Sequence, residues 1–275
     1  MRLRLSRVAL TITAIVVVLG VAIAVGLYNL LKRAEPFTAV TAGCTVSTPT
    51  GNLDLGVEQA QVAATIAAVG ARRKLPERAI VIAYATAIQE SKLSNLDYGD
   101  RDSVGVFQQR PSQGWGKPAQ LMDPVYATNK FFAALVKVKN YRKLPLEEAA
   151  QAVQRSAGGY AYAAHEGDAK ILAAAFTGRV PKSVHCRYPP PRTTPTPAPK
   201  AQTDEARKQL RRALGDTSIV TQKRGWLVAS WSVAHAQKYG LRRVGFNGAA
   251  WSADTPRSDE WKADPKAGDS AVELS

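Results

Sequence analysis

The chain has 275 residues and a formal net charge of +15 at pH 7, from 37 lysines and arginines against 22 aspartates and glutamates. This length accommodates one medium-sized domain and a small one. Its 3 histidines lack metal-ligand spacing, its 2 cysteines form no Cys-x-x-Cys pair, and nucleotide-binding fingerprints are missing, so we expect no metal and no cofactor.

The first predicted element is an apolar run from Val8 to Leu31, which carries no charge over 24 residues. It is long enough for a transmembrane helix and longer than the roughly 7–15-residue core of a cleaved signal peptide. Three arginines precede it and only Lys32 and Arg33 follow, so the positive-inside rule places the N-terminus in the cytoplasm. The run therefore predicts a signal anchor in residues 1–33, with single-pass cell-membrane localisation and an extracellular body. A cleaved signal peptide is the alternative.

Helical patterns dominate the chain after a linker expected over residues 34–53. Asp54 and Asp123 are candidate N-caps, and proline at the first position supports the second start. The segment 54–186 shows no convincing strand alternation, so its pattern is helical, in agreement with the all-α fold that the resemblance described below implies. Its helices are expected over 55–74, 79–90, 124–138, 145–154 and 160–176.

The end of the helix over 79–90 is the candidate reaction site. Glu90 stands at a helix C-terminus, where the helix dipole disfavours a carboxylate, and at the rim of an apolar segment that favours its protonated form. This placement suits a proton donor, and a solvated, inert glutamate at a frayed helix end is the alternative. Aspartates, paired amides, aromatics and glycines follow over 97–116, a composition suited to a sugar-binding groove.

Two motifs here resemble those of the lysozyme-like superfamily, in its soluble lytic transglycosylase and goose-type lysozyme branch. Glu90-Ser91 matches the family's Glu-Ser, and Gly105-Val106-Phe107-Gln108 matches its Gly-Leu-Met-Gln. The resemblance covers about residues 54–180 and implies a lysozyme-like all-α domain. It implies action on the β-1,4 bond between N-acetylmuramic acid and N-acetylglucosamine, with Glu90 as general acid and Gln108 lining a sugar subsite.

Two departures from the family leave alternatives open. The branch's Ala-Tyr-Asn-Ala-Gly motif lacks its Tyr-Asn pair here, and either Tyr160 or Tyr162 could supply the ring or simply pack. Asp100 is the candidate second catalytic carboxylate, with Asp97 and Asp102 as alternatives, and each could instead be an Asx-turn residue. The predicted substrate-binding residues are Ser91, Ser103, Gln108, Gln109 and Tyr160.

The two cysteines, Cys44 and Cys186, bracket the lysozyme-like segment. Outside the membrane cysteines can be oxidised, so we expect a disulfide that fastens the two ends of the domain. Lipidation of Cys44 in a lipobox-like Thr-Ala-Gly-Cys tetrapeptide is the alternative, weakened by the charged residues between it and the apolar run.

The C-terminal part begins with a Pro- and Thr-rich segment, expected to be an extended linker over 187–203. Residues 204–275 predict a small α+β module of unknown role. Four tryptophans there could line a carbohydrate face, but for Trp226 on a helical stripe we favour a core position.

Two functions of different class follow. The favoured one is a membrane-anchored extracellular enzyme that cleaves peptidoglycan glycan strands, either a lytic transglycosylase with Glu90 as acid and base or a muramidase in which Asp100 activates water. The alternative is a non-catalytic wall-binding or scaffolding protein on a lysozyme-like fold. In either case we expect peptidoglycan and anionic wall polymers as partners and no nucleic acid, since an exported basic domain meets the wall first.

Overall fold

The structure, a computed structural model, describes residues 7–33, 42–154, 160–188, 200–253 and 260–275. Its internal contacts divide the chain into two units, Met1–Val40 and Thr41–Ser275. The expected domain over 54–186 and the expected module over 204–275 therefore belong to one compact unit.

The first unit contains a single described helix, α1 (Arg7–Arg33). Across the described ranges, no helix is both long and apolar enough to cross a membrane. This finding contradicts the predicted transmembrane anchor, and with it the signal anchor and the single-pass membrane localisation.

The second unit is built around two almost wholly buried helices, α2 (Val57–Arg72) and α3 (Glu77–Ser91). Their inner faces are rich in alanine, which lets the helices approach closely and leaves room for larger rings between them. Tyr84 fills one such space and donates its hydroxyl to the Ala63 carbonyl at 2.8 Å. Both helices lie where the apolar periodicity predicted them, within about two residues at each end.

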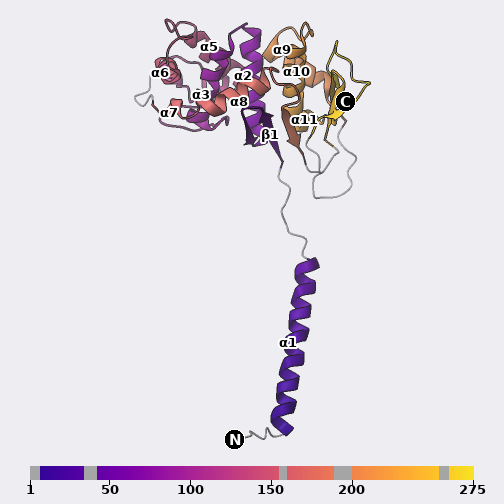
Figure 1. The fold of residues 1–275 in the computed structure, drawn as a ribbon. Helices are drawn as coiled ribbons and strands as arrows, with labels where there is room; N and C mark the ends of the chain where they lie inside the picture. Colours follow the sequence, from indigo (N-terminus) through magenta and orange to yellow (C-terminus); the bar gives the residue numbers. More distant parts are fainter. Residues whose placement is uncertain (1–6, 34–41, 155–159, 189–199, 254–259) are drawn as a thin grey trace. The chain divides into compact units, whose positions relative to one another are not determined.

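Shorter helices surround this pair (Figure 1). Asp123 caps α5 as predicted, because its carboxylate accepts the Val125 amide at 3.1 Å. The helix expected over 160–176 is broken at His165, whose φ of −96° and ψ of 2° separate α7 from α8. The bounds are η1 (Pro111–Gln113), α4 (Pro118–Leu121), α5 (Pro124–Leu135), α6 (Leu146–Gln154), α7 (Tyr160–Ala163) and α8 (Glu166–Phe176).

A three-stranded antiparallel sheet overturns the prediction of an all-α domain. Its strands are β1 (Gly43–Thr48), β2 (Gly51–Leu55) and β3 (Val184–Arg187), in the order β2-β1-β3. The prediction missed β1 because only Cys44 and Val46 alternate into the core, too short a signal to distinguish from a linker. Its second partner, β3, comes about 140 residues later, beyond the reach of any local pattern.

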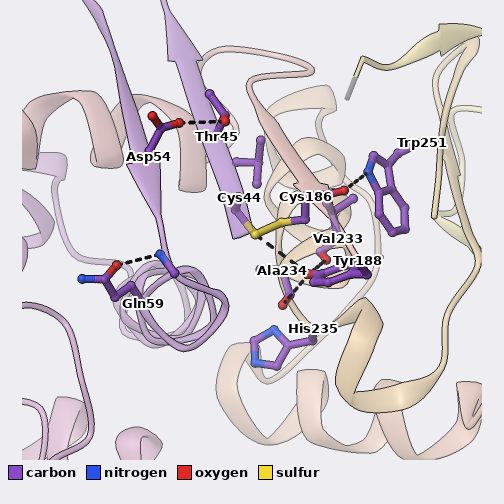
Figure 2. The surroundings of a disulfide bond; sticks show 12 residues. Cys44, Thr45, Asp54, Gln59, Cys186, Tyr188, Val233, Ala234, His235 and Trp251 are labelled. Carbon is purple, nitrogen blue, oxygen red and sulfur yellow. Dashed lines mark hydrogen bonds between the residues drawn. A yellow bond between two sulfur atoms is a disulfide. The ribbon is translucent and has the colours of Figure 1, made fainter. Parts of the chain in front are cut away.

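The predicted disulfide is confirmed at the centre of this sheet. Cys44 and Cys186 are register partners in β1 and β3, and their sulfur atoms are 2.00 Å apart. Figure 2 shows the bond packed beside Tyr188, whose hydroxyl donates to the carbonyls of Val233 and Ala234 at 2.8 and 3.1 Å. With its sulfur in this bond, Cys44 is not the free thiol that lipidation requires.

The C-terminal residues add helices and a second sheet to the same unit. The helices are α9 (Thr203–Leu214), α10 (Gln222–Ala234) and α11 (Ala236–Tyr239). The sheet has the order β6-β5-β4-β7, with β4 (Arg243–Phe246), β5 (Ala249–Ser252), β6 (Lys262–Ala263) and β7 (Glu273–Leu274). The chain is thus about half helical with two small antiparallel sheets, in place of the mainly α fold that we expected.

Tryptophans from the C-terminal part hold it against the first sheet. The indole N–H of Trp251 donates to the Cys186 carbonyl at 3.1 Å, and that of Trp261 donates to the Val184 carbonyl at 3.0 Å. Trp226 is buried against Phe246 with ring centroids 5.3 Å apart, so it is a core residue as favoured from its spacing. These tryptophans therefore connect the C-terminal helices and second sheet to the first sheet.

Candidate active site

Glu90 lies in the last turn of α3, half-buried, where the buried part of the helix gives way to solvent. The helix ends because Lys92 and Leu93 adopt left-handed conformations, with φ of 53° and 60°. This reversal turns the chain sharply after Ser91. The glutamate side chain therefore remains at the edge of the packed core.

One oxygen of the Glu90 carboxylate is held by a buried tyrosine. The hydroxyl of Tyr162, on α7, donates to Glu90 Oε1 at 2.6 Å, and the Tyr162 side chain is only 2% exposed. A hydrogen bond to a carboxylate at this distance is of the strong, charge-assisted kind. A second contact lies beside it, since His165 Nε2 is 2.9 Å from Gln89 Oε1. The end of α3 is thus fixed against the corner between α7 and α8.

Ser91 connects the helix end to the glycine-rich loop that follows. Its hydroxyl lies 2.7 Å from the Val106 carbonyl and 3.1 Å from the Ala87 carbonyl, and the side chain is buried. We expected Ser91 to contact substrate, but its position beneath the loop makes it a structural link. Through this link the Gly-x-x-Gln segment is brought to the residue next to Glu90.

The loop itself is held by close backbone packing. Gly105 has a φ of +80°, and a Cβ at this position would lie 2.4 Å from the Leu121 carbonyl oxygen. Phe107 stacks on Phe131 with ring centroids 4.5 Å apart, and its carbonyl accepts the side-chain amide of Gln154 at 2.8 Å. The packing of the loop therefore restricts which residues fit the motif, most clearly at position 105, where only glycine has room.

Gln108 is half-buried in this loop and has a φ of +46°. Its amide nitrogen donates to the carbonyls of Tyr98 and Gly105, each at 3.2 Å, so the side chain crosses the turn. Gly99 packs directly on it, because a Cβ there would lie 1.8 Å from Gln108 Oε1. A Cβ at Gly99 would also lie 2.7 Å from the backbone carbonyl oxygen of Ser103, which cannot move aside as a side-chain amide can, and this explains why a glycine precedes Asp100.

The other predicted substrate-binding residues lie in two different environments. Gln109 is 2% exposed and donates its amide to the Ala127 carbonyl at 3.3 Å, and Ser103 is also buried. Both therefore support the loop from within, where a ligand has no access. Tyr160, in contrast, is 92% exposed, and it is Tyr162 that reaches Glu90. Sequence spacing had left the choice between the two tyrosines open.

The candidate second carboxylates also differ. Asp97 and Asp100 are exposed on the loop, whereas Asp102 accepts the Ser112 amide at 2.7 Å and the Arg110 guanidinium at 2.8 Å. The Ser112 amide, together with Arg110, lowers the pKa of Asp102 far below its usual range. Asp102 is therefore ionised near neutral pH, where it links Arg110 and Ser112 within the loop and is unsuited to proton transfer.

Within the described ranges, no group of three or more His, Cys, Asp or Glu side chains could hold a metal ion. The chain matches no model of a known protein family, and it matches no curated protein.

Proposed function

We propose that the protein cleaves peptidoglycan glycan strands, with Glu90 as general acid and then general base. The observation that carries the proposal is the contact of Glu90 with Tyr162, because a buried donor holds one carboxylate oxygen and fixes the direction of the other. The Glu-Ser and Gly-x-x-Gln residues, similar to those of lytic transglycosylases and goose-type lysozymes, support it. Tyr162 serves as a positioning residue in this scheme.

The chemistry needs only one carboxylic acid. Glu90 donates its proton to the bridging oxygen as that oxygen leaves C1 of N-acetylmuramic acid. The C6 hydroxyl of the same sugar then bonds to C1 and gives its proton to the Glu90 carboxylate, which restores the acid. No water is consumed, and the product carries a 1,6-anhydro end.

A hydrolytic route needs a second carboxylate about 6.5–9.5 Å from Glu90 to activate water. Asp100 remains the candidate for this role, since Asp102 is engaged with Arg110 and Ser112. Replacing Asp100 with Asn separates the routes, because it leaves a transglycosylase active and strongly reduces a hydrolase.

The second candidate function is a non-catalytic wall-binding protein. Two observations favour it. The sequence lacks the Tyr-Asn pair of the transglycosylase motif, and the hydrogen bond from Tyr162 gives the Glu90 carboxylate a partner, as expected for a glutamate with a purely structural role. On this alternative, Glu90 stabilises the junction of α3 and α7 and no bond is cleaved.

The test incubates the full-length protein with purified wall sacculi and measures the mass of the released muropeptides. We expect 1,6-anhydro ends from the wild type, no release from Glu90→Gln, and unchanged release from Glu148→Gln, which removes an exposed carboxylate on α6. Co-sedimentation with sacculi without any release supports the binding protein. Products with reducing ends identify a hydrolase.

A further inference from the structure

A cavity of about 330 Å³ lies where the C-terminal helices meet the lysozyme-like part of the unit. Its walls come from α2, from the corner that leads into α5, and from α9, α10 and α11. The residues placed above around Glu90 are not among those walls. Its volume falls in the range of small-molecule sites, at the lower end.

One buried polar group of the cavity wall is His235, which follows α10 and is 6% exposed. Its Nδ1 lies 2.9 Å from the Trp231 carbonyl oxygen, which can only accept, so Nδ1 carries the proton. Burial lowers the pKa of His235 to about 3, so the ring is neutral at physiological pH. In the part of the chain that the structure describes, Nε2 has no hydrogen-bond partner and presents a lone pair.

Other polar groups on the wall also present acceptors. The Thr65 hydroxyl uses its proton on the Gln61 carbonyl at 2.8 Å, which leaves its lone pairs available. Asn95 donates its amide to the Met122 carbonyl at 2.7 Å, and its Oδ1 is buried without a partner among the described residues. Trp231 also lines the cavity, and its indole N–H is a buried donor without a partner among the described residues, so a ligand that satisfies this wall must supply both hydrogen-bond donors and an acceptor.

The charges around the cavity cancel. Glu58 and Asp123 contribute two negative charges, Arg212 and Lys238 contribute two positive charges, and Arg212 forms an ion pair with Asp123. A charged ligand gains no net attraction from a wall of this composition. Because burying an uncompensated charge is costly, the occupant that fits is neutral.

His235 belongs to a group of nearly parallel aromatic rings that line the cavity. Trp231 and His235 have centroids 3.9 Å apart with 16° between their planes, and Tyr239 continues the stack at 18° to Trp231. An aromatic wall with a few directed polar groups is typical of sites for sugars, whose C–H faces are apolar and whose edges carry donors.

We propose that this cavity binds a neutral saccharide unit, which donates hydroxyl or amide protons to His235 Nε2 and Thr65 Oγ1. The site is separate from Glu90, and the proposal holds whether or not Glu90 cleaves a bond. If both are correct, the C-terminal helices hold one part of a glycan while the first part of the unit acts on another.

The test follows the indole N–H signal of Trp231 in NMR spectra of the full-length Glu90→Gln protein as sugar is added. The probes are N-acetylglucosamine, its β-1,4-linked dimer, and glucosamine at a pH where its amine is protonated. We expect saturable shifts with the two neutral probes and at least tenfold weaker binding of glucosamine. No shift with the neutral probes, or tighter binding of the cationic one, overturns the proposal.

Matched variants locate the binding. Both His235→Phe, which keeps a ring in the stack, and Thr65→Val, which keeps the side-chain shape, should weaken binding at least tenfold. Gln237→Ala, on the exposed face of α11, should leave binding unchanged. Thermal melts establish that each variant is folded. Unchanged binding in a folded Thr65→Val and a folded His235→Phe would place the sugar elsewhere and refute the assignment.

Discussion

The disulfide is the strongest covalent constraint on the second unit, and removing it gives a quantitative test. Cys44 and Cys186 are separated by 142 positions, so the bond closes the chain from β1 to β3 into one loop. The chain-entropy relation for such a loop gives about 5 kcal/mol of stabilisation at 25 °C, acting on the unfolded chain. In the folded state, β1 and β3 remain paired on both sides of the bond by Gly43 with Arg187 and Thr45 with His185.

The perturbation is the double replacement Cys44→Ala and Cys186→Ala. Alanine is chosen because the two sites are 4% and 3% exposed, and serine would bury hydroxyl groups that need partners. For a unit of this size about 1 kcal/mol corresponds to roughly 2–4 °C in Tm, so we expect a decrease of about 10–20 °C with the fold retained.

The assay is calorimetry of the double variant against the oxidised wild type, with circular dichroism to establish that the secondary structure is unchanged. Wild type that is unfolded, reduced, alkylated and returned to native buffer serves as a second form without the bond. A loss of less than about 3 °C refutes the chain-entropy reasoning. Loss of folding at room temperature shows instead that the β1–β3 pairing depends on the bond.

Three further predictions concern single residues. Tyr162→Phe removes the donor to Glu90 Oε1 while keeping the ring, and because such a bond contributes about 1.5–3 kcal/mol we expect cleavage of sacculi by the folded variant to slow roughly 10- to 100-fold and its Tm to fall by about 3–12 °C. Unchanged turnover would remove Tyr162 from its positioning role. His235 has a folded pKa of about 3 against an ordinary 6.5, so the unfolded chain binds the extra proton first, and stability falls as pH falls below about 6.5. At pH 4.5 the free energy of unfolding of the wild type should be about 2–3 kcal/mol lower than at pH 7 because of His235. Urea unfolding of wild type and His235→Phe at both pH values measures this loss, which the variant should lack. Equal losses in both proteins would contradict the burial argument. Gly105→Ala places a Cβ against the Leu121 carbonyl at a positive φ, and a destabilisation of at least about 2 kcal/mol is expected, whereas a neutral result would show that the loop adjusts freely.

Local pattern by itself determined where several helices of the second unit lie. The apolar run 79–88 and the Asp123-Pro124 pair predicted α3 and the start of α5, because periodicity and capping depend on residues within one or two turns of each other. The disulfide was also accessible, since an oxidised chain with two cysteines allows only one intrachain pairing. Glu90 was singled out by the contrast between its charge and the apolar helix that it ends.

Only the tertiary structure decided what surrounds these elements. The partner of Glu90 is 72 residues away along the chain, and nothing local distinguishes the buried Tyr162 from the exposed Tyr160, because burial depends on how α7 packs against α3. The first sheet forms because β1 pairs with β3, which is distant from it in the sequence. The two buried residues of β1 are too weak a signal to predict this pairing. Likewise, His235 is neutral, and its Nε2 lacks a partner among the described residues, only because α10 packs against α2 and removes that ring from water.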